Sequence, residues 1–341
     1  MAYRVIVIGL SAGGMQPLLK ITAALPADLN AAVLVVQHIP AHAKSQLAAV
    51  IGQRAQMRVK NAEHGEALRP GTIYTAVSDR HLLVDEDRRI LIARGPKENR
   101  FRPSVDALFR SAAYNCGAST IGVVLSGALN DGASGMYTID RLGGATIVQD
   151  PKEATFADMP RSVMEYVAVQ HVAPTREIPH ILAKLCDETS EDSDNPANMT
   201  KKERDLLALE YAIARGEDAL GGGILQHGMY TPLTCPECHG ALTQIASDPI
   251  VRYRCHTGHA HTAETLLTGI DDGIETSMWE AMRGMEEGTI LLRALAEHLD
   301  RQGQIDRASS MRTRAERLKV QSQQMKGFIT EADISTEEVI S

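Results

Sequence analysis

The sequence predicts an α/β fold: a doubly wound, mostly parallel β-sheet, followed by a small cysteine-bearing unit and C-terminal helices. Three continuous apolar runs, at residues 5–8, 32–37 and 120–126, are rich in β-branched residues, which is typical of strands buried on both faces of a sheet. Segments with helical spacing alternate with these runs, which favours parallel strands joined by covering helices. Ligands bind such sheets at the carboxyl ends of the strands, so the residues after each strand are the first candidates for a site.

The remaining elements follow from the same patterns. Further strands are expected at residues 57–61, 73–76, 81–85, 89–93 and 145–149. Helices are expected at residues 15–24, 45–51, 104–114, 160–166, 177–185, 201–215 and 274–299, with one more that ends at 142 and another that reaches 328. Ser104 follows Pro103 and is the expected N-cap of its helix.

Composition limits the class of protein. The chain has 341 residues, of which 44% are apolar, enough for a globular core and more than one domain. Its net charge of −8 argues against a general affinity for nucleic acid. No apolar run is long enough to span a bilayer, and a strand begins almost at the N-terminus. We therefore expect a cytoplasmic protein without a signal peptide that is not itself a membrane protein.

A glycine-rich turn joins the first strand to the first helix, and several interpretations compete for it. As G-x-S-x-G, formed by Gly9, Ser11 and Gly13, it matches a nucleophile elbow that exposes a serine hydroxyl beside a helix N-terminus. As a dinucleotide loop it lacks the middle glycine, because Ser11 stands there. It could also be an ordinary loop in which serine caps the helix.

Three polar residues follow three of the predicted buried strands: Ser11, His38 and Asp131. Because parallel strands end at one edge, these side chains can converge although they are far apart in the sequence. A serine needs an imidazole to take its proton, and the imidazole needs a carboxylate to orient it, so the set fits a Ser-His-Asp triad. The alternative is that each is structural, since the chain has 12 histidines and Asp131-Gly132 could be a simple turn.

Four segments together carry a family resemblance: residues 8–14, 36–39, 101–106 and 125–132. They resemble the signature segments of CheB-type protein-glutamate methylesterases, in the same order and spacing, over residues 3–185. The resemblance implies a CheB methylesterase-like sheet. It also implies Ser11 as nucleophile, His38 as general acid and base, and Asp131 as the orienting carboxylate. Ala12 is the expected oxyanion donor, supported by Gly13 and Gly132.

The sequence departs from the family pattern in three ways. Leu10 stands where the family usually has a small residue, and Gly127-Ala128-Leu129 replaces a Gly-Met-Gly run. The family's N-terminal receiver domain has no counterpart, so we expect no activation by aspartyl phosphorylation within this chain.

By resemblance, the expected activity is acyl transfer through an acyl-enzyme on Ser11, which hydrolyses glutamyl methyl esters of a methylated chemoreceptor or another signalling protein. Glutamine deamidation could use the same groups. The alternatives are a serine esterase or amidase with another substrate, and a non-catalytic signalling adaptor on the same sheet.

Three of the five cysteines cluster late in the sequence. Cys235 and Cys238 form a CxxC pair, and Cys255 begins a second group that contains His256, His259 and His261. Two thiolates followed by a later cysteine and a histidine suit a structural, tetrahedral zinc site. We choose Cys235, Cys238, Cys255 and His259 as its ligands, with His256 and His261 as alternates. The competing interpretations are a redox CxxC pair or plain core cysteines.

We therefore expect four segments. Residues 1–188 form the catalytic domain, 189–230 a linker with a helix, 231–268 a zinc-ribbon-like module and 269–341 a helical, coiled-coil-like tail. Residues 189–197 have the polar, acidic composition of a linker. In the tail, a methionine- and leucine-rich stripe between Ile274 and Leu299 is typical of a buried seam. It could pack as a hairpin or join two copies of the chain into a homo-oligomer.

Overall fold

The computed structural model describes residues 3–43, 45–188, 199–245 and 249–337. The chain divides into two compact units, Met1–Leu266 and Leu267–Ser341. The predicted linker stretch at 189–197 lies outside the described residues.

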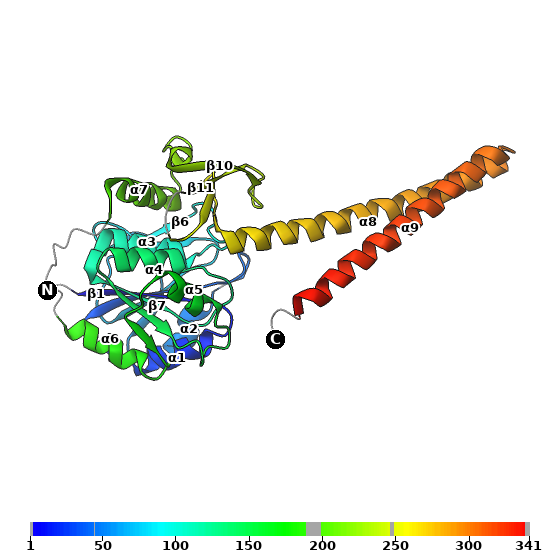
Figure 1. The fold of residues 1–341 in the computed structure, drawn as a ribbon. Helices are drawn as coiled ribbons and strands as arrows, with labels where there is room; N and C mark the ends of the chain where they lie inside the picture. The colour runs from blue at the N-terminus through cyan, green and yellow to red at the C-terminus, as the bar shows by residue number, and fades with distance from the viewer. Residues whose placement is uncertain (1–2, 44, 189–198, 246–248, 338–341) are drawn as a thin grey trace. The chain divides into compact units, whose positions relative to one another are not determined.

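A parallel sheet forms the centre of the first unit (Figure 1). Its strand order in the described residues is β3-β4-β2-β1-β7-β8-β9. The strands are β1 (Arg4–Leu10), β2 (Ala31–Gln37), β3 (Arg58–Asn61), β4 (Thr72–Thr75), β7 (Thr120–Val124), β8 (Ala145–Gln149) and β9 (His171–Ala173). Every pairing between them is parallel. The predicted α/β class is thus confirmed. The strand β9 was not predicted, because three residues are too few to show a period.

Helices cover both faces of this sheet. One group is α1 (Met15–Ala24), α2 (Leu47–Gly52) and α6 (Ile178–Asp187), and the other is α3 (Val105–Cys116), α4 (Ala133–Arg141) and α5 (Asp158–Tyr166). Alternate residues of β1 enter the two cores: Val5 and Val7 pack with the α3 side, and Ile6 and Ile8 with the α1 side. Because successive side chains of β1 enter opposite cores and both cores are apolar, the sequence of the strand is continuously apolar.

Two strands stand apart from the main sheet. The strands β5 (His81–Val84) and β6 (Ile90–Ala93) pair antiparallel as a hairpin, and β5 packs on the helix α3. Ser104 caps α3 as predicted, since its hydroxyl accepts a hydrogen bond from Ala107 N–H.

The cysteine-bearing segment folds onto the parallel sheet and its helices. The helix α7 (Lys201–Arg215) begins with a reciprocal Thr200–Glu203 capping box and packs on α3, where Tyr114 and Tyr211 have ring centroids 5.4 Å apart. It is followed by a short 3-10 turn (Ile224–His227) and an antiparallel sheet. That sheet orders as β10 (Gly228–Thr234), β11 (Ala241–Ile245), β12 (Arg252–Cys255) and β13 (Ala260–Thr262). We refer to residues 228–266 as the C-terminal module.

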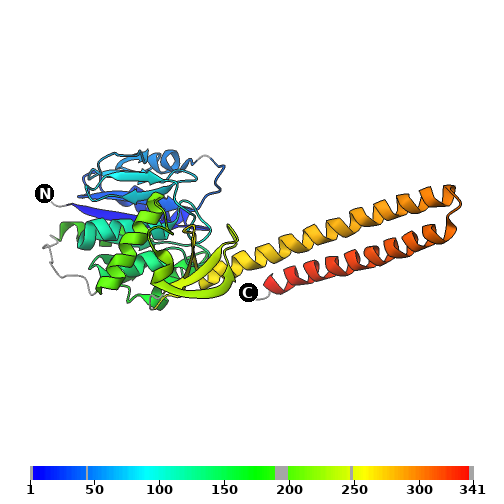
Figure 2. The ribbon, with the colours of Figure 1, turned by 90° about the horizontal axis from the view of Figure 1, so that it is seen from above.

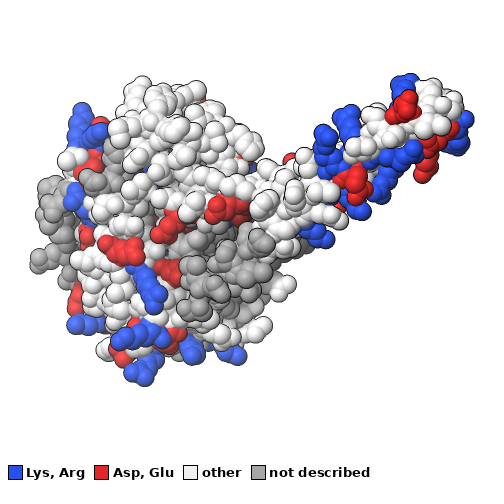
Figure 3. Space-filling model, turned by 45° about the vertical axis from the view of Figure 1, so that its right-hand side comes forward, with Lys and Arg blue, Asp and Glu red and all other residues white. Residues whose placement is uncertain are grey.

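The second unit is a helical hairpin, formed by α8 (Ala263–Arg301) and α9 (Ile305–Glu337), which run antiparallel (Figure 2). Small and apolar residues form its buried seam, including Leu292, Ala296, Ala308, Ala315 and Ile329. Of the predicted stripe, Leu292 is buried, whereas Ile274 and Leu295 are exposed. Charges of both signs are interspersed along the hairpin surface (Figure 3). Among the described residues, no helix is both long and apolar enough to span a membrane.

Candidate active site and metal-binding cluster

The fold brings the three predicted polar residues to one edge of the sheet. Ser11 directly follows β1, His38 directly follows β2, and Asp131 lies in the loop between β7 and α4. The strand β1 lies between β2 and β7, so these three strand ends are neighbours. Ser11, Ala12 and His38 line one cavity of about 490 Å³.

His38 and Asp131 form a buried pair. The imidazole Nε2 lies 2.7 Å from Asp131 Oδ2, and the two side chains are only 3% and 1% exposed. Phe101 stacks flat on the imidazole, with ring centroids 3.7 Å apart and an interplanar angle of 4°. The carboxylate and the phenyl ring together fix the position and plane of the imidazole.

The carboxylate of Asp131 is held at the start of helix α3. It accepts backbone hydrogen bonds from Val105 at 2.7 Å and Asp106 at 3.1 Å, both in the first turn of the helix. The Ser104 hydroxyl and the Asn99 amide each donate to Oδ1 at 3.0 Å. Burial acts to raise the pKa of this carboxyl group, but the bonds from His38, Asn99 and Val105 outweigh it and hold the pKa at about 2. Asp131 is therefore ionised at neutral pH.

A second buried carboxyl group, Asp106, shapes the loop that carries Asp131. Its Oδ1 accepts hydrogen bonds from Gly132 N–H at 3.0 Å and Gly135 N–H at 2.6 Å, and its Oδ2 accepts one from the Asn99 amide at 2.8 Å. The Gly132 amide is thus engaged in supporting this loop. Gly132 also adopts a φ of +104°, a left-handed conformation that favours glycine.

The serine turn is fixed by hydrogen bonds to neighbouring loops. Ser11 N–H donates to Ser126 O at 3.0 Å, and the Ser126 hydroxyl donates to Ala12 O at 2.9 Å. Gly13 has a φ of +72°, and a Cβ there would lie 2.7 Å from Ser126 Oγ, so glycine is required. Within the described residues, Ala12 N–H has no protein acceptor.

The Ser11–His38 hydrogen bond that a triad would use is not formed in this structure. His38 Nδ1 is buried and has no hydrogen-bond partner among the described residues. Because Nε2 is engaged by Asp131, Nδ1 is the ring nitrogen that remains for a proton exchange with Ser11. Catalytic hydrogen bonds are often unformed before substrate binds.

Charged side chains also line the cavity. They are Asp79, Lys97, Arg100 and Arg102. Arg102 Nε donates to Asp79 at 2.9 Å, and Arg94 lies 3.0 Å from the same carboxylate. The hydrogen bond from Arg102 lowers the pKa of Asp79. Lys97 forms an ion pair of 2.8 Å with Glu237 from the C-terminal module.

The four predicted metal ligands converge in the C-terminal module. The ligand atoms of Cys235, Cys238, Cys255 and His259 all lie within 4.8 Å of one another, so this cluster could hold a metal ion. His239 N–H donates to Cys235 O at 2.8 Å, and Gly258 N–H donates to Cys255 O at 2.9 Å, which closes the two tight turns that carry the ligands. The alternate His261 is buried and lies 3.6 Å from Cys235 Sγ, outside this cluster of four.

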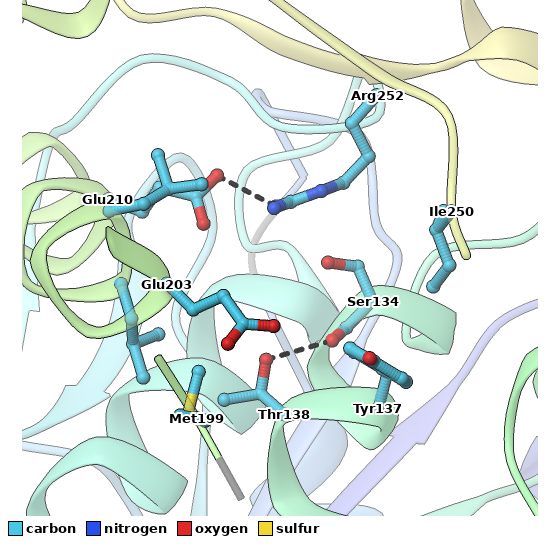
Figure 4. A pocket seen from close by; sticks show the side chains of 10 residues that line it. Ser134, Tyr137, Thr138, Met199, Glu203, Glu210, Ile250 and Arg252 are labelled. Carbon is cyan, nitrogen blue, oxygen red and sulfur yellow. Dashed lines mark hydrogen bonds and ion pairs between the residues drawn. The ribbon is translucent and has the colours of Figure 1, made fainter. Parts of the chain in front are cut away.

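A smaller cavity lies between α4, α7 and the segment at 250–252 (Figure 4). Glu210 and Arg252 form an ion pair of 2.7 Å at its edge. None of the predicted site residues lines this cavity.

Sequence reasoning missed the residues that support the pair of His38 and Asp131, notably Asn99, Phe101 and Asp106. Phe101 and Asp106 lie in the segment that carried the family resemblance, which is the signal that could have identified them. Asn99 lies outside that segment.

The N-terminal half of the chain is similar to known proteins. A family model described as CheB methylesterase matches residues 6–182. A putative protein-glutamate methylesterase/protein-glutamine glutaminase of Leptospira interrogans is 36% identical over 185 residues, which cover 54% of this chain and 96% of that protein. Protein-glutamate methylesterase/protein-glutamine glutaminase 2 of Anaeromyxobacter dehalogenans is 40% identical over 181 residues, which cover 53% of each chain.

A solved structure is also similar. The CheB methylesterase catalytic domain of Thermotoga maritima matches with a TM-score of 0.53 and 33% identity, covering 54% of this chain and 100% of that one. The matched region corresponds in size to the sheet unit with its helices. For relatives such as the Anaeromyxobacter protein, this chain spans about half of the relative's length.

Proposed function

This chain belongs to the CheB methylesterase family, and on that premise we propose that it hydrolyses glutamyl methyl esters on a methylated chemoreceptor or a similar signalling protein. The observation that carries the proposal is the buried pair of His38 and Asp131, which adjoins Ser11 in one cavity. These relatives are named protein-glutamine glutaminases as well as methylesterases, so we extend the proposal to glutamine side chains. None of the five cysteines forms a disulfide, which suits our expectation that the protein acts in the reducing cytoplasm.

In the proposed mechanism, Ser11 Oγ attacks the ester carbonyl carbon while His38 Nδ1 takes the hydroxyl proton. The ionised Asp131 stabilises the imidazolium that results, through the hydrogen bond to Nε2. The tetrahedral intermediate collapses, the bond to the methoxy oxygen breaks, and His38 returns the proton so that methanol leaves. Water then attacks the acyl-enzyme by the same route and releases the glutamate carboxylate and Ser11. With a glutamine side chain, ammonia would leave in place of methanol.

Backbone donors would stabilise the negative charge on the carbonyl oxygen. We assign this role to Ala12 N–H, because it lines the cavity, follows Ser11 and has no other acceptor in the described part of the chain. Three cationic side chains line the cavity: Lys97, Arg100 and Arg102. They would attract a substrate segment that carries further carboxylates.

The first prediction concerns the nucleophile. Ser11→Ala should abolish methanol release from methylated receptor, with a loss of several orders of magnitude in kcat, because members of a triad act as a unit. Ser162→Ala is the matched control, since Ser162 is a buried serine of α5 that does not line the cavity. Wild-type turnover in the Ser11 variant would overturn the mechanism.

A fluorophosphonate probe separates the alternatives. Labelling at Ser11 supports a serine hydrolase, whereas an unlabelled protein supports the non-catalytic adaptor. A labelled protein that cleaves simple esters but releases no methanol from methylated receptor would be an esterase with another substrate.

We further propose that the cluster in the C-terminal module binds one structural Zn²⁺ ion. Three thiols and one imidazole are the donor set that zinc prefers, and four protein ligands leave no position for a substrate. The ion would hold together the two turns after β10 and β12. In this organisation, residues 1–188 form the catalytic domain, and 189–230 link it to a zinc-ribbon-like module at 231–268. Residues 269–341 provide a helical surface for a partner or a second copy of the chain.

The second prediction tests the metal. Wild-type protein should contain one zinc per chain by elemental analysis, and Cys235→Ser should lose it, because three ligands bind the ion much more weakly than four. Cys116→Ser is the control, since Cys116 is a buried cysteine of α3 outside the cluster. Zinc retained at full stoichiometry by the Cys235 variant would contradict the assignment.

A further inference from the structure

The start of helix α8 reaches into the hydrogen-bond network of the candidate active site. Asn99, which donates to Asp131, is only 3% exposed and is held from the other side by two threonines of the C-terminal module. Thr262 N–H donates to Asn99 Oδ1 at 3.1 Å, and the Thr265 hydroxyl donates to the same oxygen at 3.2 Å. These contacts join residues that lie 163 and 166 positions apart in the sequence.

We propose that Thr262 and Thr265 are positioning residues of the active site, which act through Asn99 to hold the carboxylate of Asp131 against His38. This inference rests on the proposed hydrolase function. It makes the C-terminal module a structural part of the catalytic centre, and not only an appended surface for partners.

The Asn99 amide has one productive orientation. Its NH₂ group faces two carboxyl groups, with Nδ2 at 3.0 Å from Asp131 Oδ1 and 2.8 Å from Asp106 Oδ2. An amide rotated by half a turn would place its oxygen against both, where it could donate no hydrogen bond. Thr262 N–H and the Thr265 hydroxyl stabilise only the productive orientation, because both donate to Asn99 Oδ1 and would meet no acceptor if the amide were rotated.

The two threonines are themselves fixed by the start of the helix. Thr262 precedes Ala263, the first residue of α8, and Thr265 is the third residue of that helix. The Thr265 N–H donates to Thr262 Oγ1 at 3.3 Å, and Thr262 N–H donates to Thr265 Oγ1 at 2.9 Å, a reciprocal arrangement like a capping box. The Thr262 hydroxyl donates in turn to Asn130 Oδ1 at 2.7 Å, next to Asp131.

Asn99 needs support from outside its own loop. Asn99 and Arg100 have φ values of +50° and +73°, in the left-handed region that is costly for residues with a side chain. The strand β13 holds this loop, because Asn99 N–H donates to Ala260 O at 2.8 Å and Ala260 N–H donates to Lys97 O at 3.2 Å. The same loop continues to Phe101, which stacks on His38.

The experiment compares isosteric threonine variants of the full-length protein. Thr265→Val removes the hydroxyl but keeps the shape, and it should lower kcat for methanol release about tenfold. The KM should not change, because Thr265 does not line the cavity. Thr265→Ser restores the hydroxyl and should restore kcat. The double variant Thr262→Val/Thr265→Val should lose more, since Asn130 is then also released.

Thr243→Val is the matched control. Thr243 is a fully buried threonine of β11 in the same module, and its hydroxyl has no hydrogen-bond partner in the described part of the protein. Replacing it with valine should leave kcat unchanged. Thermal unfolding and zinc content of every variant show whether the module is still folded.

A spectroscopic readout tests the inference without any substrate. The proton on His38 Nε2, which is bonded to Asp131, should give a downfield ¹H NMR signal that shifts or broadens in Thr265→Val and returns in Thr265→Ser. An unchanged signal together with wild-type kcat would overturn the inference. If the wild-type protein proves inactive, the proposed function fails, but the NMR comparison still decides whether these threonines position the histidine pair.

Discussion

Asp106 and Asp131 are neighbouring buried carboxyl groups whose pKa values are shifted in opposite directions. Burial, and then the negative charge of Asp131, raise the pKa of Asp106 to about 7. The hydrogen bonds from His38 and Asn99 overcome burial at Asp131 and lower its pKa to about 2. Two like charges this close cannot both be stabilised, so one carboxyl group takes the charge and the other stays largely protonated below neutral pH. The charge lies on the group that faces the imidazole.

The third prediction follows from the pKa of Asp106. Because its folded pKa lies above the ordinary value of 3.8, the folded state binds more protons than the unfolded state between about pH 4 and pH 7. Its contribution to the free energy of unfolding is therefore fully present below about pH 4 and is lost as the pH rises to about 7. Asp106→Asn removes this dependence, so the variant should gain stability relative to wild type across that range.

Urea unfolding at a series of pH values between 4.5 and 7.5 measures the effect. Asp187→Asn, at the exposed end of α6, serves as the control and should show no such trend. A difference between wild type and the Asp106 variant that does not vary with pH would refute the assignment.

At the scale of elements, the contact between β1 and α3 places the serine turn against the helix that holds Asp131. Gly9, near the end of β1, allows Val105 to approach so closely that an added Cβ would lie 2.2 Å from Val105 Cγ1. The Val105 N–H is one of the donors to Asp131. The absence of a side chain at position 9 thus sets the distance between two parts of the site.

The fourth prediction is that Gly9→Ala destabilises the protein and impairs catalysis together. Overpacking of this kind costs about 1–3 kcal/mol in the free energy of unfolding, and the displaced start of α3 should lower kcat as well. Gly52→Ala, at the end of α2, is the matched control, because its nearest neighbour lies 3.8 Å away. Thermal unfolding and methanol release measure both effects. Equal stability of the two variants would mean that β1 and α3 can separate without cost.

At the scale of the first unit, a buried ion cluster joins the helices that cover the parallel sheet to α7 and the C-terminal module. Its members are Glu98, Arg110, Glu210, Arg252 and Arg254. Arg254, from β12, is 1% exposed and lies 3.2 Å from Glu98 and 3.0 Å from Glu210. Arg110, from α3, also pairs with Glu98. Burial opposes the charge of Glu210, but the surrounding arginines lower its pKa well below the ordinary value.

The fifth prediction concerns this cluster. Glu210→Gln removes the negative charge that Glu210 supplies to the guanidinium groups of Arg252 and Arg254, so it should cost about 3–5 kcal/mol in the free energy of unfolding. Glu217→Gln is the control, since Glu217 is exposed beyond the end of α7 and its pair with Arg215 contributes little. Urea unfolding compares the two. A loss at Glu210 no larger than at Glu217 would show that the cluster does not join these parts.

The sequence alone determined the features that depend on local order. Continuous β-branched runs identified β1, β2 and β7, helical spacing identified α1 and α7, and the Cys and His spacing predicted four residues whose side chains converge and could hold a metal ion. It also placed Ser11, His38 and Asp131 at the ends of strands, where a parallel sheet gathers them. Each of these signals lies within a few neighbouring residues, which is the range over which periodicity and ligand spacing act.

Only the tertiary structure decided which residues support the site and which nitrogen of His38 bonds to Asp131. The contact of Asn99 with Thr262 and Thr265, the stacking of Phe101 on His38 and the ion cluster around Arg254 join segments that are distant in the sequence. Such contacts leave no local pattern, because any polar side chain can find a partner once the chain has folded. They depend on where the C-terminal module packs against the parallel sheet and its helices. That position is set by the total surface that the two parts bury against each other.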